Sequence, residues 1–170
     1  ICCEAEDAVR GGCTHIVLPD ELQVLASDVE PSGPTGRVGS RLIAPPADVL
    51  AEALSMIATA SRPLIIVGAG ARHEMAQVLQ FAEHIGAPVA TTFKGKGMIS
   101  DSHPLGCGVL GRSGTPIASW FMNESDLVIV FGASFSNHTG IASYKPIIQV
   151  DDDPMSLGRF HSVDVPMQAN

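Results

Sequence analysis

Two glycines after a run of apolar residues form the pattern in this chain that most suggests ligand binding. Gly68-Ala69-Gly70 follows Leu64-Ile65-Ile66-Val67 directly, and a helical pattern comes next. Glycine permits a tight turn between a strand and a helix, and it lets a phosphate approach backbone N–H groups at the start of that helix. The pattern lacks the third glycine of the dinucleotide fingerprint, so a tight turn that holds no ligand explains it equally well.

Three charged residues lie in predicted loops from which they could contact a nucleotide. Asp151 follows an apolar run and could accept hydrogen bonds from a ribose hydroxyl, although a solvated acidic cluster at the end of a strand is the simpler explanation. Arg41 and Arg112 are the arginines best placed to meet a phosphate, and each is also explained as a surface charge. His103 precedes a proline and is interpreted as a turn residue, because the sequence identifies no carboxylate partner for it.

No catalytic triad and no metal site can be assembled from the sequence. The glycine after Arg112-Ser113 does not make a nucleophile elbow, because no strand precedes it. The four cysteines contain no C-x-x-C pair and are interpreted as reduced thiols of a cytoplasmic protein. The six histidines lack the spacing of a zinc site.

Apolar runs that alternate with helical patterns predict the frame that positions these residues. Strands are expected at residues 64–67, 88–92, 127–131 and 147–150, and helices at 48–60, 74–85 and 116–123. The runs are apolar throughout, which is typical of parallel strands covered on both faces. The order predicts an α/β fold, a Rossmann-like parallel sheet with helices on both faces, whose ligands bind beyond the carboxyl ends of the strands.

Several local features are also predicted. Gly86 is expected to end the second helix, and Thr115 is expected to be the N-cap of the third. Residues 94–114 are predicted to form a loop, and Ile16 to Leu18 a buried strand. The first helix is expected to bury one face, which comprises Val49, Leu50, Ala53, Leu54 and Ile57.

A change in composition divides the chain into two parts. The segment from Pro31 to Gly36 cannot form regular structure and is interpreted as a linker. Residues 1–36 are therefore expected to be a leading tail plus linker, and residues 37–170 a domain of their own. We expect Ile1 to mark a boundary of expression or processing, because no initiating methionine or signal peptide precedes it.

The composition argues against two classes of partner. The 170-residue chain has a formal net charge of −8, which would repel a phosphate backbone, and it carries no basic stripe. No apolar run approaches the roughly 18–20 residues needed to cross a bilayer. Neither nucleic acid nor a membrane is expected as a partner, and a cytoplasmic location is expected.

Short motifs occur in a fixed order between residues 41 and 166. They are residues 62–70, 86–92, 95–97, 103–105, 108–111 with Gly114, 125–128 with Gly132, 148–154 and 163–166. Each motif is modest, but in this order and spacing they resemble the central domain of thiamine-diphosphate-dependent enzymes of the acetolactate synthase and pyruvate oxidase type. The resemblance implies a DHS-like domain of the kind that binds NAD or FAD, within a lyase or transferase that acts on a 2-oxoacid.

The resemblance also implies what this chain lacks. Residues 8–23 resemble the end of the family's preceding pyrimidine-binding domain, which supplies the glutamate that activates thiamine diphosphate. A C-terminal domain holds the diphosphate through a divalent metal such as Mg²⁺. Neither element is present in this sequence, so the chain alone is expected to be inactive and not to bind thiamine diphosphate. Its expected partners are these two missing domains and further copies of itself in a homo-oligomer.

A nucleotide site is implied as well. In acetolactate synthase and pyruvate oxidase the central domain binds FAD, whereas other relatives hold ADP or nothing there. Acetolactate synthases carry arginines where this chain has Ser134 and His138, and Arg112 is expected to replace one of those phosphate contacts. The candidate cofactor-binding residues are Arg41, Gly68, Ala69, Gly70, Thr92, Phe93, Leu110, Gly111, Arg112, Gly132, Ala133 and Asp151.

Two alternatives remain beside this interpretation. The chain is also explained as a purely structural central domain of a thiamine-diphosphate-dependent decarboxylase, with no bound nucleotide. A sirtuin-like NAD-binding domain also starts from a Gly-Ala-Gly turn, but it needs an acidic-arginine motif soon afterwards. Here Ala71-Arg72-His73-Glu74 follows, and the cysteines are wrongly placed for a zinc module.

Overall fold

The computed structural model describes residues 15, 17–30, 33, 35–36, 42–136 and 138–170. The chain divides into two compact units, residues 1–42 and residues 43–170. The described part of the first unit contains one short helix, α1 (Asp20–Gln23). Val17 and Leu18 are exposed and not in a strand, so the predicted buried strand is wrong for these two residues, because no described segment of this unit pairs with them. Ile16 lies outside the described residues.

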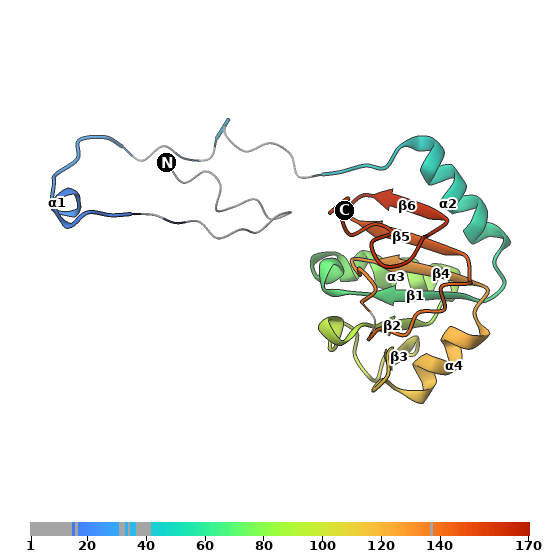
Figure 1. Cartoon of the computed structure of the whole chain (residues 1–170). Helices are drawn as coiled ribbons and strands as arrows, with labels where there is room; N and C mark the ends of the chain where they lie inside the picture. Colours follow the sequence, from blue (N-terminus) through green and yellow to red (C-terminus); the bar gives the residue numbers. More distant parts are fainter. Residues whose placement is uncertain (1–14, 16, 31–32, 34, 37–41, 137) are drawn as a thin grey trace. The chain divides into compact units, whose positions relative to one another are not determined.

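The second unit is built on a six-stranded parallel sheet, drawn from green to red in Figure 1. Its strands are β1 (Pro63–Val67), β2 (Val89–Thr91), β3 (Gly106–Val109), β4 (Leu127–Phe131), β5 (Ile147–Asp151) and β6 (Val165–Gln168). The spatial order is β3-β2-β1-β4-β5-β6, and every neighbouring pair is parallel. This is the strand order of doubly wound dinucleotide-binding folds, and it confirms the predicted Rossmann-like α/β class.

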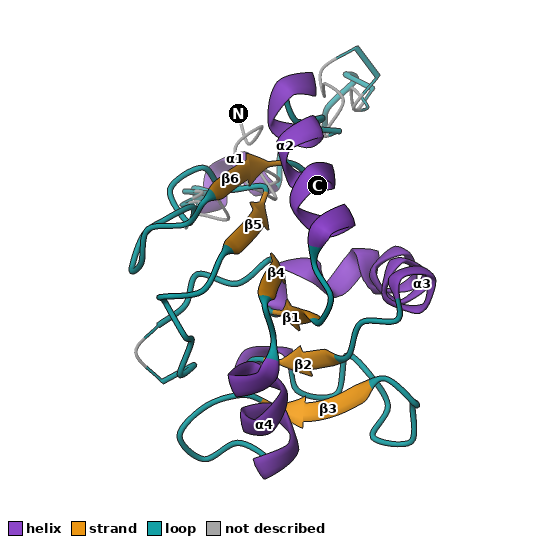
Figure 2. Cartoon of the chain, turned by 90° about the vertical axis from the view of Figure 1, so that its right-hand side faces the viewer, coloured by secondary structure: helices purple, strands orange, loops and turns teal. Residues whose placement is uncertain are grey.

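Helices cover both faces of the sheet, as predicted (Figure 2). On one face, α2 (Ala47–Thr59) and α3 (Met75–Ile85) bury Ala53, Val78 and Ala82 against Ile65 and its neighbours. On the other face, α4 (Pro116–Glu124) packs against Leu64, Ile66 and Val128 through its own buried side chains. Within the described residues no helix is long and apolar enough to span a membrane.

The ends of two helices follow the predicted capping chemistry. Thr115 is the N-cap of α4, and its Oγ1 accepts a hydrogen bond from the N–H of Ala118 at 3.2 Å. Gly86 ends α3 in the left-handed conformation, with φ +67°. Short 3₁₀ helices stand at two further turns, η1 (Ala69–Glu74) before α3 and η2 (Phe93–Gly95) after β2.

Two strands were not predicted from the residue pattern. The strand β3 lies inside the predicted loop 94–114, because two of its four residues are glycines, which are poor strand formers. Its Gly108 has φ +83°, and the carbonyl of Cys107 accepts a hydrogen bond from Thr115 Oγ1 at 2.6 Å. The strand β6 contains Pro166 and sits at an edge of the sheet, where a missing N–H donor is tolerated.

The buried face of α2 is narrower than predicted. Ala53 is buried, and Val49 and Ile57 pack against the core. Leu50 and Leu54 are 41% and 54% exposed, so the prediction that they face the core is wrong. The stripe that faces the sheet runs through Met56 and Ala60 instead, which leaves the two leucines on an adjacent side of the helix.

Candidate functional site

A cleft with a volume of about 690 Å³ lies at the carboxyl edge of the sheet. The loops that follow β1, β2, β3, β4 and β5 all contribute to it, as expected for a ligand site in an open parallel sheet. Its lining residues are Gly68, Ala69, Gly70, Thr92, Phe93, Lys94, Arg112, Ser113, Gly132, Ala133, Ser134, Phe135, Ser136, His138, Thr139, Asp151 and Ser156.

The centre of the cleft is a contact between two glycine turns. A Cβ on Gly68 would lie 2.2 Å from the carbonyl oxygen of Gly132, and a Cβ on Gly70 would lie 2.8 Å from the Cα of Gly132. Gly132 itself has φ +60°, and a Cβ there would lie 2.3 Å from the backbone nitrogen of Ala71. Only residues without side chains allow the backbones after β1 and β4 to approach so closely.

Backbone N–H groups of the turn after β1 donate hydrogen bonds across this contact. The Gly68 N–H donates to Phe131 O at 2.9 Å, and the Gly70 N–H donates to Gly132 O at 3.0 Å. The Ala71 N–H donates to Gly68 O at 3.2 Å. Three of the four N–H groups from Gly68 to Ala71 are therefore occupied within the fold. The sequence left open whether these glycines admit a phosphate or form a tight turn. In the structure they bring the backbones after β1 and β4 into contact.

Asp151 places a carboxyl group in the cleft at the end of β5. It is 9% exposed, and its Oδ1 accepts a hydrogen bond from the N–H of Asp153 at 3.0 Å. Burial raises the pKa of Asp151, the Asp153 N–H lowers it, and the nearby charges of Asp152 and Asp153 raise it further, so that it lies above the usual value. Hydroxyl donors from a ligand would favour the charged form of this carboxyl group.

Two cations line the cleft at the end away from Asp151, beyond the carboxyl ends of β2 and β3. Lys94 belongs to η2 after β2, and Arg112 belongs to the loop after β3. Both are exposed, and neither forms an ion pair within the described residues, where Arg62 pairs with Glu124 and His103 pairs with Glu83. The Arg112 N–H donates to His138 O at 3.3 Å, which ties its loop to the segment after β4.

Thr92 and Phe93 shape the wall between these groups. Thr92 donates its N–H to Val67 O at 2.9 Å, and its Oγ1 accepts from the Gly95 N–H at 3.2 Å. Phe93 is 48% exposed, and a Cβ on Gly111 would lie 2.9 Å from its Cε2. The phenyl ring therefore rests on Gly111 and presents an apolar surface beside the cations.

Most of the predicted site residues come together in this cleft. Nine of them line it: Gly68, Ala69, Gly70, Thr92, Phe93, Arg112, Gly132, Ala133 and Asp151. Leu110 does not, because it is 2% exposed in the core below, and Gly111 lies behind Phe93. Arg41 lies outside the described residues.

Sequence reasoning did not single out several lining residues, Lys94 above all. The signal for Lys94 was present, since it stands in the loop after a strand whose carboxyl end was assigned to the ligand edge. In the loop after β4, Gly132 and Ala133 were candidates. Phe135, Ser136 and Thr139 also line the cleft but were not candidates, because the course of this loop cannot be derived from the residue pattern. That loop includes Phe135, which has φ +57°.

His103 has the carboxylate partner that the sequence did not identify. Its Nε2 lies 3.4 Å from Glu83 Oε1, and its Nδ1 accepts a hydrogen bond from the Leu105 N–H at 3.2 Å. The first contact joins the loop before β3 to α3, and the second lies within that loop. His103 is not among the residues that line the cleft. In the described part of the chain, no group of three or more His, Cys, Asp or Glu side chains is placed to hold a metal ion.

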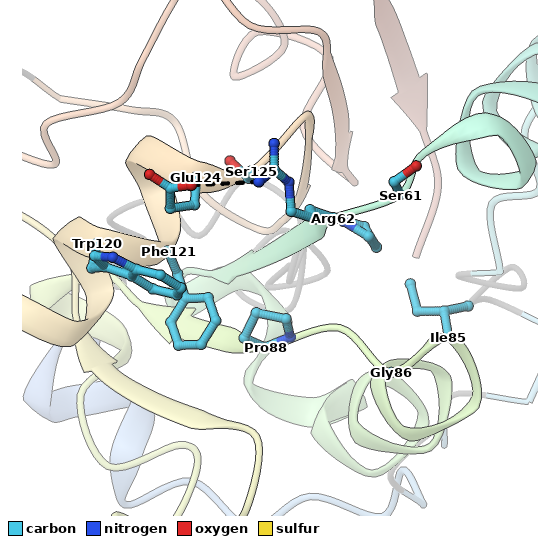
Figure 3. A pocket seen from close by; sticks show the side chains of 10 residues that line it. Ser61, Arg62, Ile85, Gly86, Pro88, Trp120, Phe121, Glu124 and Ser125 are labelled. Carbon is cyan, nitrogen blue, oxygen red and sulfur yellow. Dashed lines mark hydrogen bonds and ion pairs between the residues drawn. The ribbon is translucent and has the colours of Figure 1, made fainter.

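A second pocket, of about 240 Å³, lies at the opposite edge of the sheet (Figure 3). It is formed where the chain enters β1 and β2 and where α4 ends. The rings of Trp120 and Phe121 meet edge to face with centroids 4.9 Å apart, and Arg62 pairs with Glu124 at 3.4 Å. This pocket is therefore separate from the cleft at the carboxyl edge.

Comparison with known proteins identifies a family. The model of the thiamine pyrophosphate enzyme central domain matches residues 50–170. A probable acetolactate synthase large subunit of Methanococcus aeolicus is 36% identical over 170 residues, which cover 93% of this chain and 28% of that protein. The large subunit of acetolactate synthase isozyme 1 of Escherichia coli is 30% identical over 169 residues, which cover 95% of this chain and 29% of that protein.

A solved structure supports the fold. A candidate thiamin diphosphate-dependent enzyme from Mycobacterium smegmatis superposes with a TM-score of 0.64 at 23% sequence identity, over 78% of this chain and 27% of that one. The chain spans less than a third of the length of these relatives.

Proposed function

The chain belongs to the family of thiamine pyrophosphate enzyme central domains, and from this premise we propose that it provides the nucleotide site of an acetolactate synthase-like enzyme acting on a 2-oxoacid. The proposed nucleotide is FAD or ADP. The observation that carries the proposal is the distribution of charge in the 690 Å³ cleft. A buried carboxyl group stands at one side of it, and two cations without ion-pair partners in the described chain stand at the other.

A nucleotide complements this distribution. Its ribose carries hydroxyl donors for a carboxylate such as Asp151, and its phosphates carry negative charge for Lys94 and Arg112. Phe93 offers an exposed aromatic surface against which a flat ring system of the ligand could stack. The chain as a whole is acidic, with a net charge of −8, so a local pair of cations facing a hollow favours an anionic ligand.

We assign thiamine diphosphate chemistry to the rest of the longer enzyme. When bound, that cofactor supplies the carbanion chemistry that acts on 2-oxoacids. The described residues of this chain include no cluster of ligands for the divalent metal that holds its diphosphate. The proposal is that this domain contributes architecture, assembly and a nucleotide site, and that the chain alone does not turn over a 2-oxoacid.

A second function is favoured by a specific observation. The N–H groups of the Gly68–Gly70 turn are largely occupied. The family resemblance also implies that Ser134 and His138, which line the cleft, stand where acetolactate synthases carry arginines. A purely structural domain, as in a decarboxylase without a bound nucleotide, would need none of these contacts.

Isothermal titration of the purified chain with FAD, ADP and NAD distinguishes the two functions. We expect saturable binding of FAD or ADP. The family resemblance assigns a flavin contact to Arg41, so we expect Arg41→Ala to weaken FAD binding by about tenfold. If none of the three nucleotides binds, either to this chain or to the full-length enzyme, the nucleotide site is wrong and the structural function is supported.

A further inference from the structure

The glycine turn after β1 has little capacity left for an anion. Its Gly68 and Gly70 N–H groups donate to Phe131 and Gly132 carbonyl oxygens, and the Ala71 N–H donates back to Gly68. Ala69 and Gly70 already belong to η1, a 3₁₀ helix of only six residues. A phosphate placed over this turn would therefore find most of the usual donors already used.

Lys94 and Arg112, by contrast, project from turns that the fold holds firmly. The backbone on either side of Lys94 is fixed by the Thr92 N–H to Val67 O bond and by Gly95, where a Cβ would lie 2.8 Å from Val67 O. The backbone of Arg112 is fixed by its bond to His138 O. Cations that are anchored at their base lose less entropy when they bind a ligand.

The two sides of the cleft are separated by a fixed distance. The strands that end next to Lys94 and Asp151 are β2 and β5, and β1 and β4 lie between them. Three inter-strand spacings correspond to roughly 14 Å. The cleft therefore has a positive side and a carboxyl side, with the closely packed glycine turns in between.

From this arrangement we propose that Lys94 and Arg112 form the phosphate-binding subsite of the cleft, and that the Gly68–Gly70 turn does not. The inference rests on the proposed nucleotide function and deepens it. The ligand lies across the ends of the strands, with its ribose at Asp151 and its phosphates at Lys94 and Arg112.

The chain offers a matched control for Lys94. Lys96 is a second exposed lysine two residues away, and it is not among the residues that line the cleft. ADP binding to the purified chain is measured by isothermal titration at low and at physiological salt, for wild type and for the Lys94→Ala, Arg112→Ala and Lys96→Ala variants. Circular dichroism of each variant verifies that it is folded.

We expect Lys94→Ala and Arg112→Ala each to weaken ADP binding by about tenfold and to reduce its dependence on salt. Lys96→Ala should remain within about twofold of wild type, since only the remote field of the charge changes. Wild-type affinity in both cleft variants, with ADP still binding saturably, would overturn this inference and leave the nucleotide function standing. Failure of the wild-type chain to bind any nucleotide would overturn both.

Discussion

Single residues decide how closely the turns after β1 and β4 can approach. Gly68, Gly70 and Gly132 touch through backbone atoms, with no space for a Cβ on any of them. The sequence identified these positions as special, because glycine between a strand and a helix is a known signal. It could not distinguish a glycine that admits a ligand from one that admits another backbone, since both need the same absent side chain.

Gly132→Ala should destabilise the fold severely. The new Cβ would lie 2.3 Å from the nitrogen of Ala71 and would require alanine at φ +60°. We expect the free energy of unfolding in urea to fall by about 3 kcal/mol or more, because strain and a backbone clash combine. Gly86→Ala is the matched control, since Gly86 has φ +67° with open space around it, and it should cost only about 1 kcal/mol. Equal losses in the two variants would show that the contact between the turns contributes nothing.

The predictability of the site also differs from residue to residue. Asp151 was placed at the cleft because it follows a buried strand, and topology alone brings such positions to one edge. Leu110 was included through family resemblance, yet its side chain turns into the core. The difference between a lining side chain and a buried neighbour depends on packing, which a motif does not specify.

Among the elements, helices and central strands were predicted well and the edges of the sheet poorly. The strands β1 and β4 are continuous apolar runs buried on both faces, and such runs are a strong signal. At the edges, β3 consists of Gly-Cys-Gly-Val and β6 includes a proline, so neither follows strand propensity. Tertiary contacts form these strands, and β3 is joined to α4 by the Thr115 hydroxyl.

Thr115→Ala should therefore loosen a helix and an edge strand together. Its Oγ1 accepts from the Ala118 N–H and donates to the carbonyl of Cys107 in β3. We expect a loss of about 1–2 kcal/mol in the free energy of unfolding, measured with urea. Thr59→Ala is the control, because the Thr59 hydroxyl bonds only to exposed carbonyl groups at the end of α2. That variant should change stability by less than about 0.5 kcal/mol, and a loss as large as that of Thr115→Ala would contradict the capping argument.

At the scale of the whole molecule, the second unit contains everything needed for a stable core. Both hydrophobic clusters and all six strands of the sheet lie between residues 43 and 170. The domain boundary near residue 36 was inferred from proline and glycine content, and it stays a prediction.

Deleting residues 1–42 separates stability from ligand binding. The truncated chain should unfold in urea with a free energy within about 0.5 kcal/mol of the full chain, because no strand or core residue of the second unit is removed. Isothermal titration of the truncated chain with FAD tests the flavin contact that the family resemblance implies for Arg41, and we expect a lower affinity than that of the full chain. A large loss of stability would show that residues 1–42 form part of the folded domain.

The strand order has a consequence for how the chain is made. In the finished sheet β1 is central, and its second neighbour is β4, whose residues are synthesised about sixty positions later. Until β4 has left the ribosome, one side of Leu64-Ile65-Ile66-Val67 has no strand to pair with, although this is among the most apolar segments of the chain. Unpaired apolar strand edges are sites of aggregation, so the nascent chain passes through a period in which a chaperone would find its most accessible target at β1.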